Sequence, residues 1–225
     1  MKLRIGFLGL GAMGLSHVHS IRKLAGDKAE IIALCDLSEI NLQKGIEAAP
    51  GAKVYQAAND LIQAPLDAII VSTPNFTHAH LASDILAAGK HLFLEKPCGI
   101  TSAECYQVLK VANASDRVLM LGHELRYSPF FQKVKDLVDA GEIGAPRMVW
   151  TREFRGPFQI KAGNWIQDDR RSGGCLVDKN CHHFDMMNWW VGARPKSVSA
   201  FGGCAVNRVI QGEHQAPGHW CRRIY

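Results

Sequence analysis

The sequence has 225 residues, of which 47% are hydrophobic and 21% are charged, and its formal net charge is +5. This length and composition are typical of a globular protein with one dinucleotide-sized domain and a smaller partner domain. Basic and acidic residues are interleaved without a basic run, which disfavours nucleic-acid binding, and no stretch approaches the roughly 20 apolar residues of a membrane span.

The first half of the chain alternates short apolar runs with amphipathic segments, as repeated βα units do. Strands are predicted at Leu3 to Leu8, Glu30 to Cys35, Leu66 to Val71, His91 to Leu94 and Val118 to Leu121, with a weaker one at Lys53 to Tyr55. Helices are predicted at Met13 to Leu24, Glu39 to Ala48, Thr77 to Ala88 and Ser102 to Ala114. Because these strands are apolar on both faces, they predict a doubly wound α/β fold, a parallel sheet covered by helices on each side.

After Gly122 the rhythm changes, and we divide the chain there. Residues 1–122 form the predicted dinucleotide-binding domain, 123–207 a partial second domain, and 208–225 an atypical tail that we expect to be disordered. The second domain is predicted to contain helices at Pro129 to Ala140 and Lys179 to Val191 and strands at Arg147 to Glu153 and Lys196 to Val206.

A glycine-rich turn follows the first predicted strand and opens the first helix, with the sequence Gly9-Leu10-Gly11-Ala12-Met13-Gly14. In this context the pattern predicts a dinucleotide site, whose three glycines allow a tight turn, close approach of the pyrophosphate and helix packing. Asp36 ends the second strand, 22 positions after Gly14, where a carboxylate can accept both ribose hydroxyls. Because its charge would repel a 2′-phosphate, NAD is favoured over NADP.

Two further motifs end predicted strands. Thr73-Pro74-Asn75, with His78, follows the strand Leu66 to Val71, and Glu95-Lys96-Pro97 follows His91 to Leu94. Both therefore lie at the carboxyl edge of the sheet, where such folds bind ligands. Taken alone, the first could be an ordinary helix cap and the second a solvated ion pair before a loop proline.

Asp178 and His182 are four residues apart at the start of a predicted helix, a spacing that puts both on one face. Histidine is the side chain best able to exchange a proton near neutral pH. A metal site of Asp178, His182, His183 and Asp185 is an alternative, although His183 would project elsewhere, and a purely structural histidine also stays open.

Together these motifs resemble the Gfo/Idh/MocA family of NAD(P)-dependent sugar and polyol oxidoreductases. The resemblance rests on Gly9 to Gly14, Asp36, Thr73-Pro74-Asn75 with His78, Glu95-Lys96-Pro97, the junction Gly122 to Pro129, and Gly173 to Asp178 followed by His182. It implies a Rossmann domain followed by a substrate domain with an open, mostly antiparallel sheet.

The resemblance also implies roles for individual residues. His182 would take the alcohol proton, Lys96 would hold the same oxygen and stabilise the developing alkoxide, and Asp178 would contact or orient the substrate. The implied cofactor contacts are Gly9, Leu10, Gly11, Ala12, Met13, Gly14, Asp36, Thr73, Pro74, Asn75, His78, Glu95 and Lys96. No metal ion is implied.

We therefore predict an NAD-dependent dehydrogenase that acts on a secondary hydroxyl of a sugar or polyol. Two other functions stay open, a catalytically silent NAD-binding regulator and an NAD-dependent glycosidase that works by transient oxidation. The seven cysteines contain no Cys-x-x-Cys pair, which favours reduced thiols and a cytoplasmic location over a disulfide framework or a zinc knuckle.

Family members continue well beyond the predicted strand Lys196 to Val206, with most of a large open sheet. The resemblance thus predicts a truncated substrate domain in this chain and an activity that the truncation impairs. Because that sheet commonly makes the dimer contact, a family-like homo-oligomer would have to form without part of its usual surface.

Overall fold

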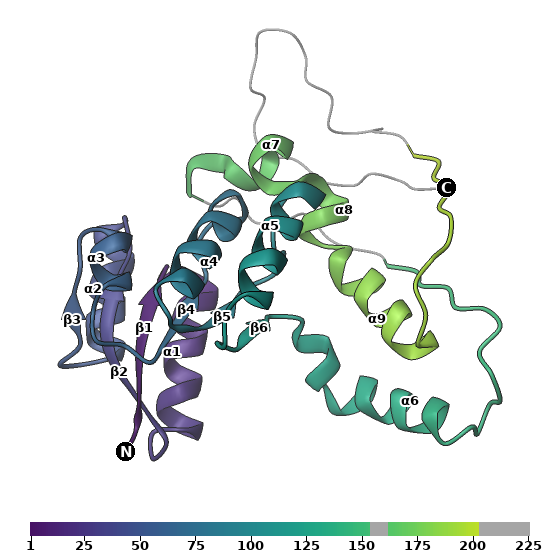
Figure 1. Cartoon of the computed structure of the whole chain (residues 1–225), viewed down its shortest axis with the longest axis horizontal. Coiled ribbons are helices and arrows are strands. Elements are labelled where there is room, and N and C mark those ends of the chain that lie inside the picture. Colours follow the sequence, from purple (N-terminus) through teal and green to yellow (C-terminus); the bar gives the residue numbers. More distant parts are fainter. Residues whose placement is uncertain (154–161, 203–225) are drawn as a thin grey trace, which may run out of the picture. The chain divides into compact units, whose positions relative to one another are not determined.

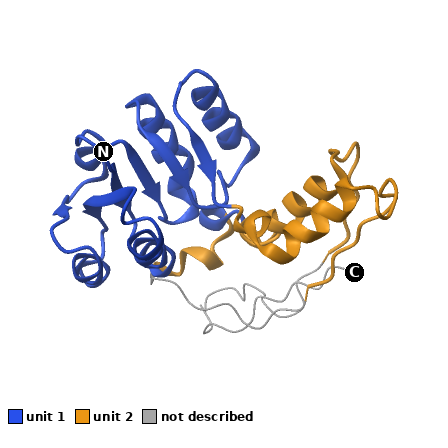
Figure 2. Ribbon diagram, turned by 90° about the horizontal axis from the view of Figure 1, so that it is seen from below, with its two compact units in different colours: residues 1–122, 170–173 blue, residues 123–169, 174–225 orange. Residues whose placement is uncertain are grey.

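The computed structural model describes residues 1–153 and 162–202 of the chain (Figure 1). Its residues fall into two compact units, which Figure 2 colours separately. Unit 1 contains Met1–Gly122 and Arg170–Gly173, and unit 2 contains His123–Asp169 and Gly174–Tyr225. Each unit is described by itself below.

Unit 1 is built on a six-stranded sheet with the order β3-β2-β1-β4-β5-β6, in which all neighbouring strands are parallel. The strands are β1 Leu3–Leu8, β2 Ala29–Cys35, β3 Lys53–Val54, β4 Ala68–Val71, β5 His91–Leu94 and β6 Leu119–Leu121. The helices are α1 Ala12–Leu24, α2 Glu39–Ala48, α3 Ala58–Ile62, η1 Asn75–Thr77, α4 His78–Ala87 and α5 Ser102–Asn113. The predicted parallel α/β fold is confirmed, and the short α3 was not predicted.

Alternate residues of the central strands bury their side chains on opposite faces of the sheet. Phe7 and Ile70 belong to one core cluster, which includes residues of α1 and α2. Their neighbours Leu8 and Val71 belong to the other, which includes residues of α3, α4 and α5. Burial on both faces explains why these strands are nearly continuous apolar runs.

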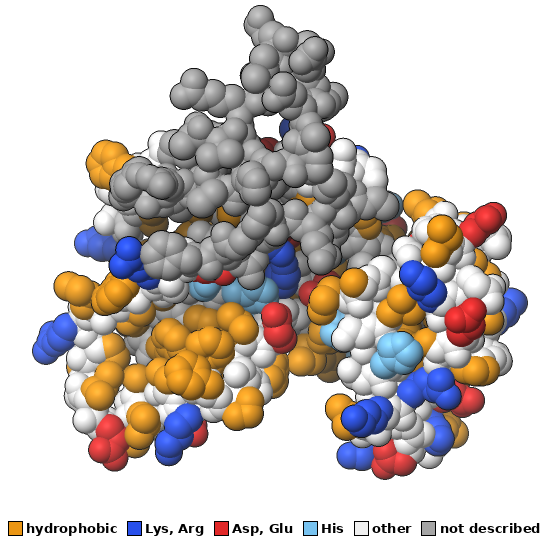
Figure 3. Space-filling model, turned by 180° about the vertical axis from the view of Figure 1, so that it is seen from behind, with side chains coloured by type: hydrophobic (Ala, Val, Ile, Leu, Met, Phe, Trp, Pro, Cys, Tyr) orange, Lys and Arg blue, Asp and Glu red, His pale blue; other side chains and the backbone are white. Residues whose placement is uncertain are grey.

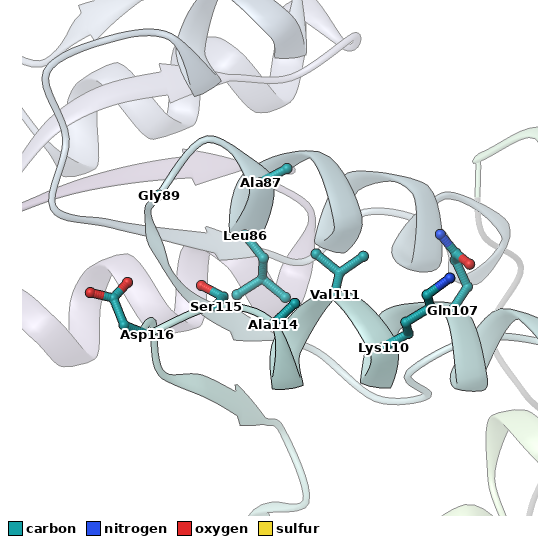
Figure 4. A pocket seen from close by; sticks show the side chains of 9 residues that line it. All are labelled: Leu86, Ala87, Gly89, Gln107, Lys110, Val111, Ala114, Ser115 and Asp116. Carbon is teal, nitrogen blue, oxygen red and sulfur yellow. The ribbon is translucent and has the colours of Figure 1, made fainter.

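The strand order reverses beside β1, since β2 lies on one side of it and β4 on the other. In open parallel sheets the ligand crevice lies outside the carboxyl ends of the strands at such a point. By contrast, the groove drawn in Figure 4 lies at the C-terminal ends of α4 and α5. In βα units those ends lie at the opposite edge of the sheet, so this groove is separate from the crevice.

The described part of unit 2 is helical. Its elements are η2 Glu124–Tyr127, α6 Pro129–Asp139, η3 Ala162–Gln167, α8 Gly174–Asp178 and α9 Cys181–Val191, and the one-turn α7 Asp169–Ser172 connects it to unit 1. The predicted strand Arg147 to Glu153 is wrong, because the structure has no strand at 147–153. For the predicted strand Lys196 to Val206, residues 196–202 contain no strand and 203–206 lie outside the described residues, as does the predicted tail 208–225.

A strand exists only where a neighbouring strand accepts and donates its backbone hydrogen bonds. No strand is present among the described residues of unit 2, so a segment with β-type side chains there has no partner. The antiparallel sheet implied by the family resemblance is therefore not confirmed by the structure.

The best-defined packing in unit 2 joins η2 and α6 to α9. The Arg126 guanidinium donates two hydrogen bonds to the Asp185 carboxylate, at 2.7 and 2.6 Å, and lies 5.6 Å from the ring centre of Trp189. The Trp190 indole donates to the Phe131 carbonyl at 3.4 Å. A bidentate pair of this kind fixes the orientation of the two elements.

Much of the apolar surface of unit 2 is exposed. No residue of α6 is buried, although the helix carries apolar side chains along one side, and Phe130 on it is 69% exposed. Figure 3 shows hydrophobic side chains gathered at the lower left, where α6 and α9 lie. Within the described ranges, no helix is long and apolar enough to cross a membrane.

Candidate functional site

Two of the three motif glycines are required by close backbone contacts. Gly9 has a φ of +90°, and a Cβ atom there would lie 2.8 Å from the carbonyl group of Ser72. The Ser72 hydroxyl donates a hydrogen bond to the Gly9 carbonyl at 2.8 Å. A Cβ atom on Gly14 would lie only 2.2 Å from the Gly9 carbonyl oxygen. Only glycine allows this left-handed turn and this close packing of α1 on the turn.

The second motif glycine faces open space. A Cβ atom on Gly11 would meet no atom within 4 Å, and no side chain caps the N-terminus of α1. Leu10 is buried beneath the turn, whereas Ala12 and Met13 are exposed in the first turn of the helix. The N-terminus of α1 thus has no side-chain cap and has open space beside Gly11, an arrangement that can accept a phosphate group.

Asp36 lies beside the glycine turn at the end of β2. One of its carboxylate oxygens accepts a hydrogen bond from the Leu10 amide at 2.5 Å, and the other accepts one from the Ser38 amide at 2.7 Å. Each carboxylate oxygen can accept a second hydrogen bond. The residue can therefore accept both hydroxyls of a ribose, and its charge disfavours a phosphate at the same place.

The turn after β4 is held by hydrogen bonds of its own side chains. The hydroxyls of Thr73 and Thr77 lie 2.6 Å apart, and Thr77 donates to the Pro74 carbonyl at 2.7 Å. The Asn75 side-chain amide donates to the Ser172 carbonyl at 2.9 Å, and both residues are buried. Asn75 thus fixes the backbone of the Arg170–Gly173 segment within unit 1.

His78 links the turns that follow β4 and β5. Its Nδ1 atom lies 2.6 Å from the Pro97 carbonyl oxygen, and its Nε2 atom lies 2.9 Å from the Thr73 carbonyl oxygen. Burial lowers the pKa of this imidazole, although both carbonyls and the nearby Glu95 carboxylate oppose the shift. A neutral ring carries one N–H and can donate to one of the two carbonyls.

Glu95 is buried and paired, rather than lying on the surface. One carboxylate oxygen lies 2.7 Å from Nε2 of His17 on α1, and the other accepts a hydrogen bond from the Lys96 amide at 3.2 Å. Burial alone would raise the pKa of this carboxyl, but His17 and the Lys96 amide outweigh it, so the pKa lies below its ordinary value. The solvated ion pair considered from sequence is wrong for Glu95.

His17 is the residue at this edge that sequence reasoning missed. It lies on α1, 78 positions before its partner Glu95, and its ring packs edge-on against Phe93 of β5, with 5.0 Å between ring centres. The sequence contains one indication of its position. His17 is three residues after Gly14, and residues three apart lie on the same face of a helix, so His17 lies on the face of α1 that carries Gly14. Lys96 is partly exposed and lies two residues after the end of β5.

Asp178 and His182 lie in unit 2 on two different helices. Asp178 is the last residue of α8, and α9 begins at Cys181 after a turn at Lys179 and Asn180. The two residues therefore do not share a face of one continuous helix, and that prediction is wrong. Asp178 is buried, and one of its carboxylate oxygens lies 3.4 Å from the Lys179 ammonium.

His182 lies among residues of the segment that opens unit 2. Its Nε2 atom is 3.6 Å from a carboxylate oxygen of Glu124, and its ring meets the His123 ring edge-on, with 5.6 Å between centres. The sequence motif at the domain junction contains both neighbours, but its spacing alone did not indicate this contact.

The alternative metal site does not assemble among its four residues. Asp185 pairs with Arg126, and His183 Nε2 lies 3.5 Å from a Glu153 carboxylate oxygen. Within residues 1–153 and 162–202, no group of three or more His, Cys, Asp and Glu side chains is placed to hold a metal ion.

Comparison with known protein families gives two adjacent matches. Residues 3–123, more than half of the chain, match the GFO/IDH/MocA model described as an oxidoreductase family with an NAD-binding Rossmann fold. Residues 131–217 match the GFO/IDH/MocA C-terminal domain.

Curated relatives with similar sequences include inositol dehydrogenases. The chain is 31% identical to the myo-inositol 2-dehydrogenase of Thermotoga maritima over 209 residues, which cover 92% of this chain and 60% of the relative. It is also 31% identical to the inositol 2-dehydrogenase of Rhizobium meliloti over 210 residues, or 93% of this chain and 61% of the relative. The chain thus spans about 60% of the length of these relatives.

Solved structures with the same fold include two dehydrogenases. A putative myo-inositol dehydrogenase from Sinorhizobium meliloti aligns with a TM-score of 0.75 and 28% identity over 92% of this chain and 60% of that chain. The WlbA dehydrogenase of Bordetella pertussis, solved with NADH and UDP-GlcNAcA, aligns with a TM-score of 0.81 and 26% identity over 92% and 60%.

Proposed function

The chain belongs to the GFO/IDH/MocA oxidoreductase family, and we propose that it is an NAD-dependent dehydrogenase of a sugar or polyol. The observation that carries the proposal is the carboxyl edge of the unit 1 sheet, where an open glycine turn, the Asp36 carboxylate and Lys96 follow the ends of three strands. Such an arrangement suits a dinucleotide whose reactive ring is placed beside a lysine. The family and its inositol dehydrogenases support the same reading.

The residues around the turn fit NAD. Gly9, Gly11 and Gly14, with the amides of Leu10, Ala12 and Met13, would hold the pyrophosphate, and Asp36 would accept the ribose hydroxyls. Thr73, Pro74 and Glu95 would line the crevice beside Lys96. Asn75 and His78 would shape it through the backbone atoms that they hold. NADP fits less well, because Asp36 would repel its 2′-phosphate.

The chemistry divides between the two units. NAD, when bound, supplies the hydride acceptor. The Lys96 ammonium would hold the substrate oxygen and stabilise its negative charge as the proton leaves. His182 would accept that proton on Nε2, where the Glu124 carboxylate would stabilise the resulting imidazolium. Asp178 would contact the substrate or orient His182.

The substrate class that we propose is a polyol, with cyclic polyols of the inositol type first. This choice follows the inositol dehydrogenases among the relatives, and it leaves sugars as the second class. The remaining expectations are also proposals: a substrate domain beginning near His123 with an open antiparallel sheet, and a cytoplasmic location.

A titration and an absorbance screen test the proposed function on the 225-residue chain. NADH fluorescence should change on binding, whereas Asp36→Ala should weaken the binding and NADPH should bind less tightly. Incubation of the protein with NAD and a panel of polyols, sugars and aryl glycosides should then produce NADH with a polyol. A chain that binds no NADH contradicts the proposal.

The same screen separates the alternatives. Release of the aryl group without net NADH would indicate a glycosidase that works by transient oxidation. NADH binding without turnover of any compound would indicate a silent NAD-binding regulator. Lys96→Ala and His182→Ala should abolish turnover and leave the affinity for NADH unchanged.

A further inference from the structure

We propose that His17 is a positioning residue for Lys96 and that it acts through the buried carboxylate of Glu95. The inference rests on the proposed function, because it concerns how Lys96 is held beside the cofactor. It assigns a role to a histidine of the first helix that lies outside both the Gly9 to Gly14 turn and the Glu95-Lys96-Pro97 motif.

A chain of hydrogen bonds links His17 to Lys96. His17 Nε2 lies 2.7 Å from one oxygen of Glu95, and the other oxygen accepts the Lys96 amide at 3.2 Å. A carboxylate only accepts hydrogen bonds, so Nε2 of His17 carries the proton in this contact. The Glu95 carboxylate therefore bridges a side chain of α1 and the peptide group of Lys96.

The Glu95 side chain is confined by its neighbours. Glu95 is buried, and a Cβ atom on Gly122 would lie 3.2 Å from its carboxylate. The Phe93 ring packs edge-on against His17 from the preceding strand. A side chain enclosed in this way has few other positions, so the carboxylate fixes the peptide plane of Lys96 rather than following it.

Loss of His17 would disturb this chain. Without His17, the buried Glu95 carboxylate keeps the Lys96 amide as a donor but loses the partner of its other oxygen, so it moves toward solvent or becomes protonated. Movement toward solvent breaks the hydrogen bond from the Lys96 amide, and protonation weakens it because a neutral carboxyl is a poorer acceptor. Removal of His17 should thus change the position of Lys96, to which it is linked through Glu95.

The hydrogen bonds from His17 to Lys96 also connect Lys96 to the proposed cofactor site. The N-terminus of the helix that carries His17 has no side-chain cap, and in the proposed function its amides would bind the pyrophosphate. One rigid helix would then set both the position of the cofactor and, through Glu95, the position of the lysine. Because both positions would depend on the same helix, the distance between the cofactor and the Lys96 ammonium would stay constant. A shift of about 1 Å in such a distance can lower the rate about 100-fold.

The experiment compares three variants of the 225-residue chain. His17→Leu removes the donor, His17→Gln keeps an N–H at about the same distance along the side chain, and His19→Leu is the matched control on an exposed position of the same helix. For each, the acetylation rate of every lysine by a small reagent is measured by mass spectrometry, together with the melting temperature and the affinity for NADH.

We expect His17→Leu to change the acetylation rate of Lys96 several-fold while Lys23, on the same helix, and Lys90, before β5, react as in the wild type. The NADH affinity should be retained, and His17→Gln should restore the Lys96 rate toward the wild type. Where turnover is measured, His17→Leu should lower kcat about 10–100-fold with an unchanged KM for NAD.

Two results would overturn the inference. The first is a Lys96 rate in His17→Leu equal to that in the wild type and in His19→Leu. The second is a rate change shared by all lysines, which would report general unfolding. Failure of the wild-type chain to bind NADH is a different result, because it contradicts the proposed function and leaves the labelling comparison readable.

Discussion

The two units of the molecule hold their helices in different ways. In unit 1, α4 has six buried residues in ten and lies over one face of the sheet. In unit 2, the eleven-residue α6 has none, and its contacts with α9 run through aromatic rings and the nearby Arg126–Asp185 pair. The buried apolar residues of unit 2 are Trp165, Ile166 and Met186, among the residues that the structure describes.

This difference separates the candidate site residues whose positions are fixed by a packed core from those whose positions are not. The glycine turn, Asp36 and Glu95 are fixed by a sheet with a core on each face, so their geometry follows from unit 1 alone. Asp178 lies on the five-residue α8 and His182 on the eleven-residue α9, and few side chains are buried among the described residues of unit 2. A region with little apolar burial opens more readily than a well-packed core.

Hydrogen exchange should show this contrast as the largest effect. Amides of α4 should exchange only through large openings, whereas those of α6 should exchange near the rate of a frayed helix. We expect a difference of at least about 1000-fold, which corresponds to roughly 4 kcal/mol at 1.4 kcal/mol per factor of ten. Peptide-resolved mass spectrometry measures both helices in one sample.

The protein concentration provides the control for that measurement. If α6 is protected at high concentration and exchanges quickly at low concentration, its apolar side is covered by association between molecules. Equal protection of α4 and α6 at every concentration would break the contrast between the units.

The glycines of the turn should separate packing from ligand binding. Gly14→Ala places a Cβ atom 2.2 Å from the Gly9 carbonyl oxygen, so we expect a loss of about 3 kcal/mol in the free energy of unfolding. Gly11→Ala meets open space and should cost about 1 kcal/mol or less. Because its methyl group projects where the pyrophosphate would approach, it should still weaken NADH binding at least about tenfold.

Urea unfolding and NADH titration of the two variants provide the test. The two glycines are matched in chemistry and lie on the same turn, so each variant is the control for the other. A Gly11→Ala protein that keeps full NADH affinity would show that the open space beside this residue is not the phosphate site.

The elements of unit 1 could be predicted from the sequence because its strands are buried on both faces and the apolar residues of its helices recur about every 3.6 positions. The strand predicted at Arg147 to Glu153 is absent although its side chains are typical of strands. A strand needs a partner strand, which can be distant in the sequence, and local periodicity does not indicate whether one exists. The break between α8 and α9 falls at Asn180, which is the N-cap of α9. The Asn180 side chain makes no capping hydrogen bond and its backbone is helical, so the preference of asparagine for helix N-caps does not explain the break.

The site shows the same limit. Gly9, Gly14 and Asp36 follow from local rules about turns and strand ends, and the structure gives each of them a contact that explains it. The pairing of Glu95 with His17 joins residues 78 positions apart. No pattern in either segment predicts it, because it depends on how α1 lies beside β5.

The smallest effect concerns an exposed pair at the other edge of the sheet. Asp67 accepts two hydrogen bonds from the Arg4 guanidinium, at 3.1 and 2.7 Å, and one from the Arg4 amide at 2.8 Å. The hydrogen bonds of Arg4 lower the pKa of Asp67 from 3.8 to about 2. Because the folded-state pKa is depressed, the stabilisation is present above pH 3.8 and is lost as the pH falls toward 2.

Asp67→Asn should therefore lower the melting temperature by about 2 °C or less at pH 7, since the pair is exposed and screened by solvent. The difference from the wild type should shrink as the pH is lowered from 4 toward 2. Asp116→Asn, at the exposed pair with Arg117, is the control and should show a smaller difference, because its partner is the adjacent residue. A difference for Asp67→Asn that stays constant with pH would mean that the variant disturbs packing at the start of β1, and the ionised carboxylate would then not be the source of the effect.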